Sequence, residues 1–369
     1  MKCKTSEFSE ALQLAKPALS LNNILPVMQS YCFTGTTVFT YNDFLAIGIA
    51  LETPFIAAIS GDALHKCITT MRSEEMSFVQ DGDSLLIKSG RSKLAFVTQP
   101  EKSFALTPDE LKDNILATIK VDRSFTEGLA SAMISIDTQF FYDVYGSVGL
   151  ALTEGEALTL YSTDDQTLTR VLLPKTECPA LGGFDKDIIL LPNDFCKQYI
   201  KLYKHFFADH NGTVTLRLSD QYLHCDFGED YGWLLVELPD AETIPYDDVY
   251  LESMPDTEKS EWLKVDDDLR AILARATALH KLGVNRNATQ ETLCISEGAK
   301  ENEAKLEQDT GSQDLAETWV GGLSPETEIM VNPALMLRAA KALPEAHWAS
   351  GDVVVFRNGE HITHLISLG

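Results

Sequence analysis

Three lysines recur at helical spacing near the middle of the chain, at Lys197, Lys201 and Lys204. At 100° per residue, their side chains fall within about 60° of one another on a predicted helix. The opposite side of that helix is apolar and aromatic: Cys196, Tyr199, Tyr203, Phe206 and Phe207. The pattern predicts a helix that packs through its aromatic side and presents three ammonium groups outward, as phosphate binding requires.

Basic residues also mark the outward sides of other predicted helices: Lys66, Arg72, Arg270, Lys281, Arg338 and Lys341. On one helix, such residues usually do no more than keep an exposed face in water. If related helices line one surface, their charges add to a continuous positive lane. This placement matters because the formal net charge of -25 would ordinarily count against a nucleic-acid partner.

Acidic and histidine clusters offer a second kind of chemistry, that of a metal-dependent enzyme. Asp164-Asp165 and the run 266–268 could hold a divalent cation. The first pair lies at a predicted turn and the run at a helix start, where acids offset the helix dipole, so structural roles are favoured. His361 and His364 are three apart on a predicted strand and face opposite ways, which argues against a shared metal. No catalytic triad, nucleophile elbow or phosphate-binding glycine loop occurs, and we expect no enzyme activity, metal or cofactor.

The seven cysteines include no C-x-x-C pair, and an odd number of scattered cysteines indicates free thiols in a reducing compartment. No apolar run approaches the roughly 18 residues of a membrane span. We therefore expect a cytoplasmic protein without a membrane partner.

The elements that carry these residues form a unit that occurs three times. Each copy has an early helix (6–19, 124–136, 266–279) and a later helix that starts near residue 60, 193 or 333. Strand candidates rich in β-branched and aromatic residues lie between them, such as 31–41, 45–51, 157–162 and 169–173. The repeat predicts an α+β fold with two helices packed on a largely antiparallel sheet in each domain.

Three domains are expected, at residues 1–116, 117–253 and 254–369. The boundaries fall in polar, proline-containing stretches, Thr107 to Asn114 and Met254 to Glu261. The acid-rich stretch Glu297 to Glu317 shows no periodicity and is interpreted as an exposed loop or hairpin.

Several motifs along the whole chain resemble those of one family. They are Leu85 to Leu94 (LLIKSGRSKL), Ile24-Leu25-Pro26, Thr153 to Leu158 with Ser162-Thr163-Asp164, Leu235 to Pro239 with Ile244-Pro245-Tyr246, and Val331-Asn332-Pro333 with Leu337. In these the chain resembles the bacterial-type DNA sliding clamp, the beta subunit of DNA polymerase III.

The resemblance implies a head-to-tail homodimeric ring of six like domains, with helices lining a hole around double-stranded DNA. Such a ring holds DNA by topology, so weak phosphate contacts suffice and allow sliding, and no bond is broken. The implied partners are the DNA polymerase, the clamp loader and other proteins that carry a clamp-binding motif.

The resemblance also implies a hydrophobic cleft that binds a short extended peptide, partly formed by the C-terminal strand. On that strand Ile362, His364, Ile366 and Leu368 share one face, opposite Thr363, Leu365 and Ser367. Leu168, Pro245, Val249 and Leu335 occupy the corresponding places around the cleft. For any one of these residues, an ordinary core position is the simpler interpretation.

The chain departs from the family at several of these places. Asn22 stands where an arginine is common, and Val144 and Tyr145 stand at an aromatic pair that touches DNA, so only Tyr145 is expected to do so. Asp165, Gln166 and Thr167 replace a Gly-His-Arg run beside the cleft. We expect a divergent clamp, such as one encoded by a phage; the alternative is a clamp-like interaction scaffold that does not encircle DNA.

Overall fold

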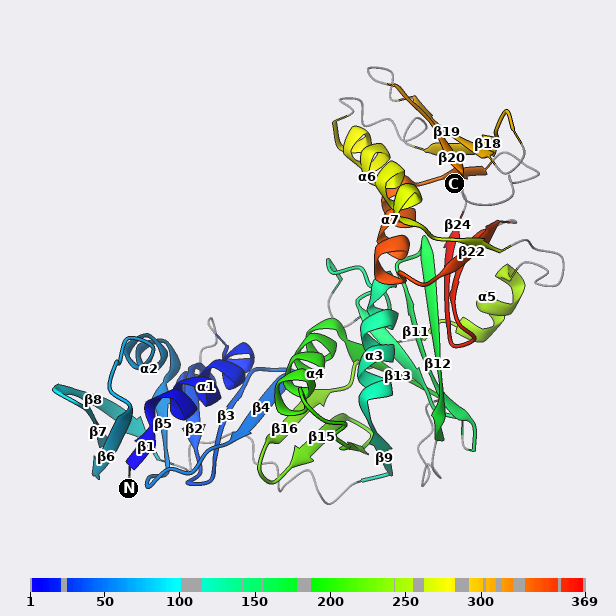
Figure 1. Ribbon diagram of the computed structural model, residues 1–369. Helices are drawn as coiled ribbons and strands as arrows, with labels where there is room; N and C mark the ends of the chain where they lie inside the picture. Colours follow the sequence, from blue (N-terminus) through cyan, green and yellow to red (C-terminus); the bar gives the residue numbers. More distant parts are fainter. Residues whose placement is uncertain are drawn as a thin grey trace. The chain divides into compact units, whose positions relative to one another are not determined.

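The computed structural model describes residues 2–20, 25–100, 115–140, 143–153, 155–177, 187–241, 243–254, 262–282, 292–300, 303–309, 314–320, 329–350 and 353–367. These residues form two compact units, which Figure 1 shows with their elements labelled. The first comprises residues 2–123 and 197–238, and the second comprises 124–177, 187–196 and 239–367. Of the two predicted boundary stretches, 107–114 lies outside the described residues, as does 254–261 except for Met254.

The first unit is built on one antiparallel sheet in the order β1-β6-β7-β8-β5-β2-β3-β4-β16-β15-β14-β9. Its strands are β1 (Lys2–Lys4), β2 (Ser30–Phe33), β3 (Thr37–Tyr41), β4 (Leu45–Ala50), β5 (Ala57–Ser60), β6 (Glu75–Asp81), β7 (Ser84–Ser89), β8 (Ser92–Gln99), β9 (Ala117–Val121), β14 (Val214–Leu218), β15 (Tyr222–Gly228) and β16 (Gly232–Glu237). Strand β4 pairs with β16, from Gly232 opposite Ile49 to Val236 opposite Leu45. Because this pairing joins strands from the first and second predicted domains into one sheet, the three-domain division stays a prediction.

Three helices pack on this sheet: α1 (Thr5–Ala15), α2 (Gly61–Ile68) and α4 (Asn193–Phe206), whose residues from Lys197 onward belong to this unit. Phe8 of α1 is fully buried, with its ring centroid 5.7 Å from Phe33 and 5.3 Å from Phe78. The Tyr31 hydroxyl donates to the carbonyl of Leu12 at 3.0 Å. Buried aromatic side chains therefore hold the helices by their apolar sides.

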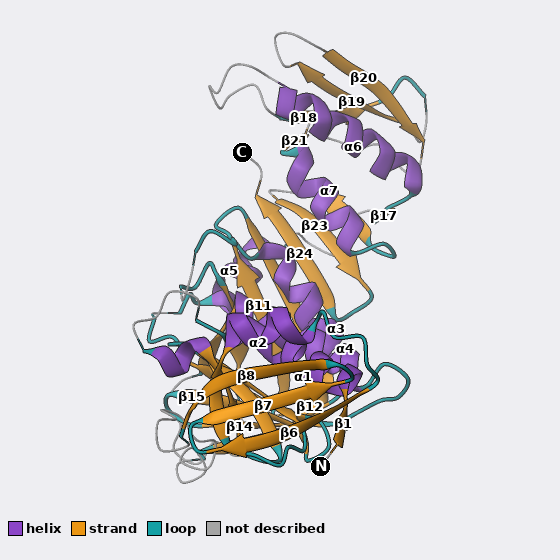
Figure 2. Cartoon of the chain, turned by 90° about the vertical axis from the view of Figure 1, so that its left-hand side faces the viewer, coloured by secondary structure: helices purple, strands orange, loops and turns teal. Residues whose placement is uncertain are grey.

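The second unit contains an eight-stranded sheet, β13-β10-β11-β12-β24-β23-β22-β17, and a four-stranded sheet, β20-β19-β18-β21. The strands are β10 (Ser147–Ala151), β11 (Ala157–Thr163), β12 (Thr167–Glu177), β13 (Ile188–Pro192), β17 (Leu263–Lys264), β18 (Leu293–Glu297), β19 (Glu303–Asp309), β20 (Asp314–Val320), β21 (Ile329–Val331), β22 (His347–Ser350), β23 (Val353–Asn358) and β24 (Ile362–Ser367). Its helices are α3 (Arg123–Ala132), α5 (Tyr246–Ser253), α6 (Asp267–Leu282) and α7 (Pro333–Ala342). Figure 2 shows α6 running alongside β19 and β20.

The six predicted helices are present, as is the antiparallel sheet that carries them, so the predicted α+β class is confirmed. Helix α5 was not predicted. The acidic stretch forms part of a hairpin with a buried side, since Ala304, Leu306 and Gln308 of β19 are at most 2% exposed. Strand β19 therefore has a period of two, so the expectation of no periodicity was wrong there, while the hairpin interpretation is confirmed. Within the described part of the chain, no helix is long and apolar enough to cross a membrane.

Candidate functional site

The basic ridge, defined as Lys197, Lys201 and Lys204, lies on the exposed side of α4. On its inner side Tyr199 and Tyr203 are at most 2% exposed. The rings of Tyr199 and Phe227 lie 5.6 Å apart, and the Tyr203 hydroxyl donates to the carbonyl of Gly212 at 2.8 Å. The aromatic anchoring thus fixes which way the three ammonium groups project; their contact with DNA stays a prediction.

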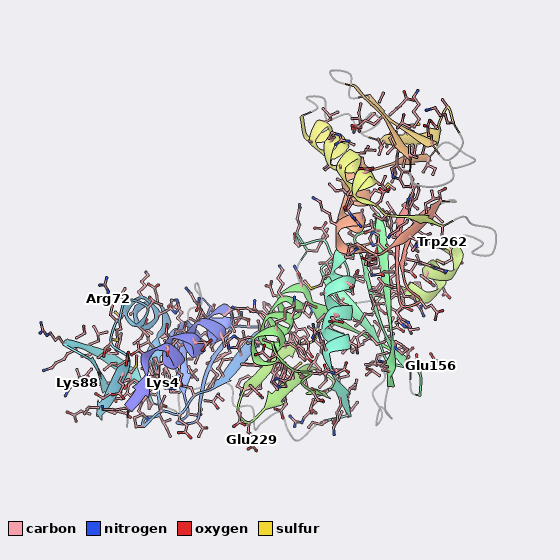
Figure 3. The ribbon with its side chains drawn as sticks, in the orientation of Figure 1. Lys4, Arg72, Lys88, Glu156, Glu229 and Trp262 are labelled. Atoms are coloured by element: carbon pink, nitrogen blue, oxygen red, sulfur yellow. The ribbon has the colours of Figure 1, made fainter. Side chains whose placement is uncertain are left out.

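The other predicted phosphate contacts differ in how accessible they are. Arg72, labelled in Figure 3, is exposed, as are Lys66 and Lys341. Lys66 also forms an ion pair with Asp62 at 2.7 Å. The side chain of Lys281 lies outside the described residues.

Tyr145 is half-buried and packs against the cluster around Tyr246 and Leu168. Its ring centroid lies 5.8 Å from that of Phe140. Only part of the Tyr145 ring is accessible to solvent, and its contact with DNA stays a prediction.

Arg270 is held within the second unit. It donates to the carbonyls of Ala340 at 3.0 Å and Val265 at 3.2 Å, and it pairs with Asp267 at 2.7 Å. Its side chain is only 21% exposed. The guanidinium bridges α6 to the end of α7 instead of projecting outward, and its contact with phosphates stays a prediction.

Arg338 is likewise committed to a partner in its own unit. Its guanidinium donates to a carboxylate oxygen of Asp164 at 2.6 Å and to the Thr167 hydroxyl at 3.0 Å. Of the two basic residues expected on the outward side of this helix, Lys341 is exposed, whereas Arg338 faces the β11–β12 turn, so the outward placement of Arg338 was wrong.

An apolar cluster covers one face of the second unit's large sheet, where α5 lies beside β12 and β24. Leu168, Leu365 and Tyr246 are at most 6% exposed, and the Tyr246 ring stacks on Tyr161 at 5.1 Å. Half-buried residues border this cluster: Tyr145, Ile244, Tyr250, Met254, Trp262 and Val353. Val249 (39% exposed) and Pro245 are exposed on or beside α5. We call this cluster, its border and the exposed residues beside it the α5 face.

The residues predicted for the peptide cleft divide between the two faces of this sheet. Strand pairing sets Leu168 opposite Leu365, and directly opposed residues share a face. Ile366, Leu335 and Ile362 pack in the other cluster, together with α6 and α7. His364 is also on that side, and Leu368 lies outside the described residues. The alternation along the strand was correct, but it was assigned to the wrong side, so Leu365 replaces His364 and Ile366 on the α5 face.

Sequence reasoning also missed Arg170, Tyr250 and Trp262. The Arg170 guanidinium lies 4.9 Å from the Tyr250 ring centroid and donates to the Tyr161 hydroxyl at 3.2 Å. Arg357 lies 4.8 Å from the ring centroid of Trp262, which Figure 3 labels. Such cation–π pairs place charge at the edge of an aromatic surface. Arg170 could have been placed on this face from the sequence, because it follows Leu168 by two residues along β12 and therefore points to the same side of the sheet.

Behind the α5 face, hydroxyl groups and a histidine form a buried polar cluster. The fully buried His364 bonds through Nδ1 to Thr169 at 2.8 Å and to Ser135 at 3.3 Å. Burial, together with the nearby charge of Arg338, lowers the pKa of His364 from 6.5 to about 3, so the ring is neutral at ordinary pH.

This lowered pKa predicts a pH-dependent stability. Between pH 6.5 and 3 the unfolded chain binds a proton that the folded chain does not, so the free energy of unfolding falls as the pH falls. From pH 7 to pH 5 we expect the wild type to lose about 2 kcal/mol more than His364→Gln. Denaturant titrations at the two pH values measure the difference, and parallel losses in both proteins would contradict the assignment.

Asp266, the first residue of the acidic run 266–268, has structural partners. Asp266 accepts from the backbone N–H of Leu269 at 2.7 Å and from the Trp319 indole at 3.0 Å. Among the described residues, no group of three or more histidine, cysteine or carboxylate side chains is placed to hold a metal ion.

No family model matches the sequence, and a search of curated proteins finds no significant match. Solved structures do match over 100% of this chain. The Pseudomonas aeruginosa sliding clamp (DNA polymerase III subunit beta) bound to griselimycin aligns with a TM-score of 0.81 and 14% identity over 98% of that chain. A putative DNA polymerase III beta subunit from Eubacterium rectale aligns with a TM-score of 0.81 and 13% identity over 98% of that chain. The Helicobacter pylori beta clamp bound to a DNA ligase peptide aligns with a TM-score of 0.80 and 14% identity over 99% of that chain. The predicted DNA clamp fold is confirmed.

Proposed function

We propose that this protein is a DNA sliding clamp, a non-catalytic processivity factor that encircles duplex DNA and tethers a DNA polymerase. The observation that carries the proposal is the end-to-end likeness of the chain to DNA polymerase III beta subunits, at TM-scores of 0.77 to 0.81. The exposed basic ridge of α4 supports it, because clustered ammonium groups bind phosphates without reading sequence. The low identity, 13 to 16%, suits a divergent clamp such as one encoded by a phage. We propose that the protein acts in the cytoplasm.

Assembly into a head-to-tail homodimer is the second part of the proposal. In the described residues, β8 pairs with β5 only through Thr98 and Gln99, so its stretch 92–97 is an open edge that carries the 82%-exposed Val97. Strand β20 ends the four-stranded sheet and carries Val320, 65% exposed. Open strand edges are templates for pairing with another chain. We propose that the β8 edge of one copy pairs with the β20 edge of the next.

A third part concerns the polymerase, the clamp loader and other partners that carry a clamp-binding motif. The Helicobacter pylori clamp is bound to a DNA ligase peptide. In the present chain, the α5 face offers apolar and aromatic side chains together with the exposed Val249. A short extended peptide with a few hydrophobic anchors suits such a surface.

Retention on circular DNA tests the proposal. A ring loaded on nicked circular DNA is expected to stay bound through gel filtration at moderate salt and to be lost once the circle is cut, because a ring slides off a free end. In solution the mass should be twice the 40.8 kDa of one chain. Equal retention on circular and linear DNA would contradict encirclement. Failure to bind either DNA, with peptide binding intact, would favour the interaction scaffold.

A further inference from the structure

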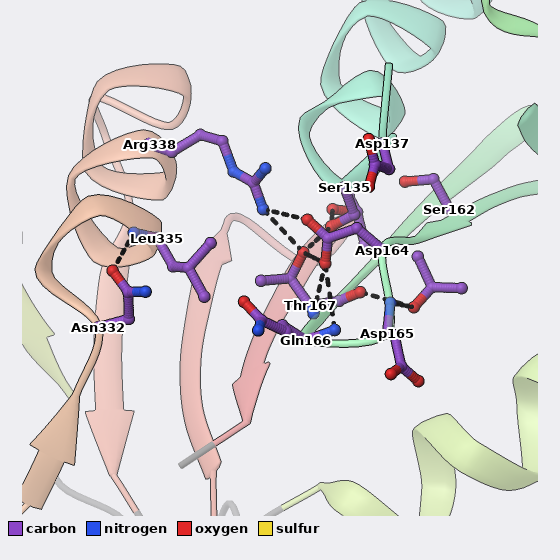
Figure 4. Close-up of polar contacts among 12 residues, drawn as sticks. Ser135, Asp137, Ser162, Asp164, Asp165, Gln166, Thr167, Asn332, Leu335 and Arg338 are labelled. Carbon is purple, nitrogen blue, oxygen red and sulfur yellow. Dashed lines mark hydrogen bonds and ion pairs between the residues drawn. The ribbon is translucent and has the colours of Figure 1, made fainter. Parts of the chain in front are cut away.

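The turn between β11 and β12 is held from the side of helix α7 (Figure 4). One nitrogen of the Arg338 guanidinium donates both to Asp164 at 2.6 Å and to the Thr167 hydroxyl at 3.0 Å. The Asp164 side chain is 11% exposed and that of Arg338 is 35% exposed. Charge-assisted hydrogen bonds that are partly shielded from water are among the stronger polar contacts in proteins. Arg338 therefore ties two elements that are about 170 residues apart in the sequence.

The same carboxylate organises the turn itself. Its other oxygen accepts from the backbone N–H groups of Gln166 at 3.2 Å and Thr167 at 2.8 Å, and from the Thr167 hydroxyl at 2.8 Å. Asp165 has a φ of 72°, a left-handed conformation that an aspartate tolerates but few other side chains do. Asp164 thus serves both as the cap of a constrained turn and as the partner of Arg338.

Thr167, the first residue of β12, connects the turn to the buried hydroxyl groups on the helix side of the sheet. Its hydroxyl lies 2.8 Å from the Ser135 hydroxyl, which bonds to Thr169 at 2.7 Å. Leu168 follows Thr167 directly and faces the opposite side, where it packs with Leu365. Because successive strand side chains point to opposite faces, fixing Thr167 on the helix side fixes Leu168 on the other.

We propose that Arg338 is a positioning residue for peptide binding: by clamping Asp164 and Thr167, it sets where Leu168 and the first residues of β12 stand on the α5 face. The inference rests on the proposed function, since it assigns a role to a residue behind the peptide-binding surface. It also assigns Arg338 a role other than contact with DNA.

The experiment combines three variants with two readouts in the full-length protein. Arg338→Ala removes the clamp. Asp164→Asn keeps an oxygen to cap the turn but weakens the pairing with Arg338. Lys305→Ala on β19 is the matched control, because it removes one exposed cation and its ion pair with Glu307 from the same unit at a residue outside every predicted site. Hydrogen exchange of the segment 163–168 reports the turn, and fluorescence anisotropy reports binding of a labelled peptide with the sequence of the DNA ligase segment bound by the Helicobacter pylori clamp.

In Arg338→Ala we expect exchange in this segment to accelerate and the peptide Kd to rise about tenfold, the size of effect that loss of a charge-assisted hydrogen bond produces. Asp164→Asn should weaken binding in the same direction. The double variant, Arg338→Ala with Asp164→Asn, should bind the peptide no more weakly than Arg338→Ala alone, since both changes break the same contact. Lys305→Ala should leave both readouts unchanged.

Distinct outcomes separate the inference from the function on which it rests. Faster exchange with an unchanged Kd, or an equal loss of affinity in Lys305→Ala, overturns the positioning role and leaves the clamp proposal intact. If the wild type does not bind the peptide, the peptide-binding part of the proposed function fails and this inference fails with it. Retention on circular DNA stays an independent measure of encirclement in every variant.

Discussion

Reversing the charges of Lys197, Lys201 and Lys204 together, each to Glu, is expected to weaken the protein's retention on nicked circular DNA. All three side chains are exposed on α4, so the fold should survive the change. Each lysine that neutralises a phosphate releases a counterion, so loss of three such contacts should lower the slope of log affinity against log salt by about three. The affinity for short duplex DNA, measured across a salt series, gives this slope.

A charge-matched variant serves as the control. Lys175, Lys264 and Lys305 are exposed on the strands β12, β17 and β19, and their reversal to Glu changes the net charge by the same amount. This control should retain DNA like the wild type. If it loses DNA as fully as the ridge variant does, overall charge governs retention and the ridge has no special role.

The helices could be predicted from the sequence because each has one continuous apolar stripe. Tyr199 and Tyr203, four residues apart, are buried on the inner side of α4, as their spacing requires. The helix α5 was missed because Tyr246–Ser253 lacks such a stripe. It gains its helical conformation by packing Tyr246 against the sheet, a tertiary contact that local pattern does not encode.

The candidate site was harder to predict because it depends on pairings between distant strands. Periodicity placed His364 and Ile366 on one face but could not say which face Leu168 shares. The pairing of Leu168 with Leu365 settles that question, across nearly 200 residues of sequence.

The arginine side chains were hard to assign from the sequence for the same reason, because their partners lie elsewhere in the chain. A helical wheel places Arg270 and Arg338 on the outward sides of their helices. In the structure, Arg270 reaches carbonyl groups beyond its own helix, and Arg338 reaches Asp164. Partners of this kind decide whether a cation is available to a ligand, and they become visible only once the helices are packed.

The structure also decides how the α5 face should be tested. A deletion of Leu365 to Gly369 would remove half of β24, which pairs with β12 on one side and β23 on the other. It would also remove Leu365 and Ile366, at most 4% exposed, and loss of each such side chain costs about 2–5 kcal/mol. The deletion would therefore report unfolding of this unit, and a surface substitution is needed instead.

Val249→Glu is that substitution. Val249 lies three residues after Tyr246 and one before Tyr250, at the exposed edge of the apolar cluster, so a carboxylate there would have to lose its water when a hydrophobic peptide docks. We expect the affinity for a clamp-binding peptide to fall at least tenfold, as for an interface hot spot, with the unfolding midpoint unchanged. Met330→Glu on β21 is the matched control, because Met330 is 40% exposed and Val249 is 39% exposed. Titration calorimetry with both variants distinguishes a local effect from added charge alone: equal affinities in Val249→Glu and the wild type would exclude the α5 face, whereas a loss confined to Val249→Glu would locate the peptide there.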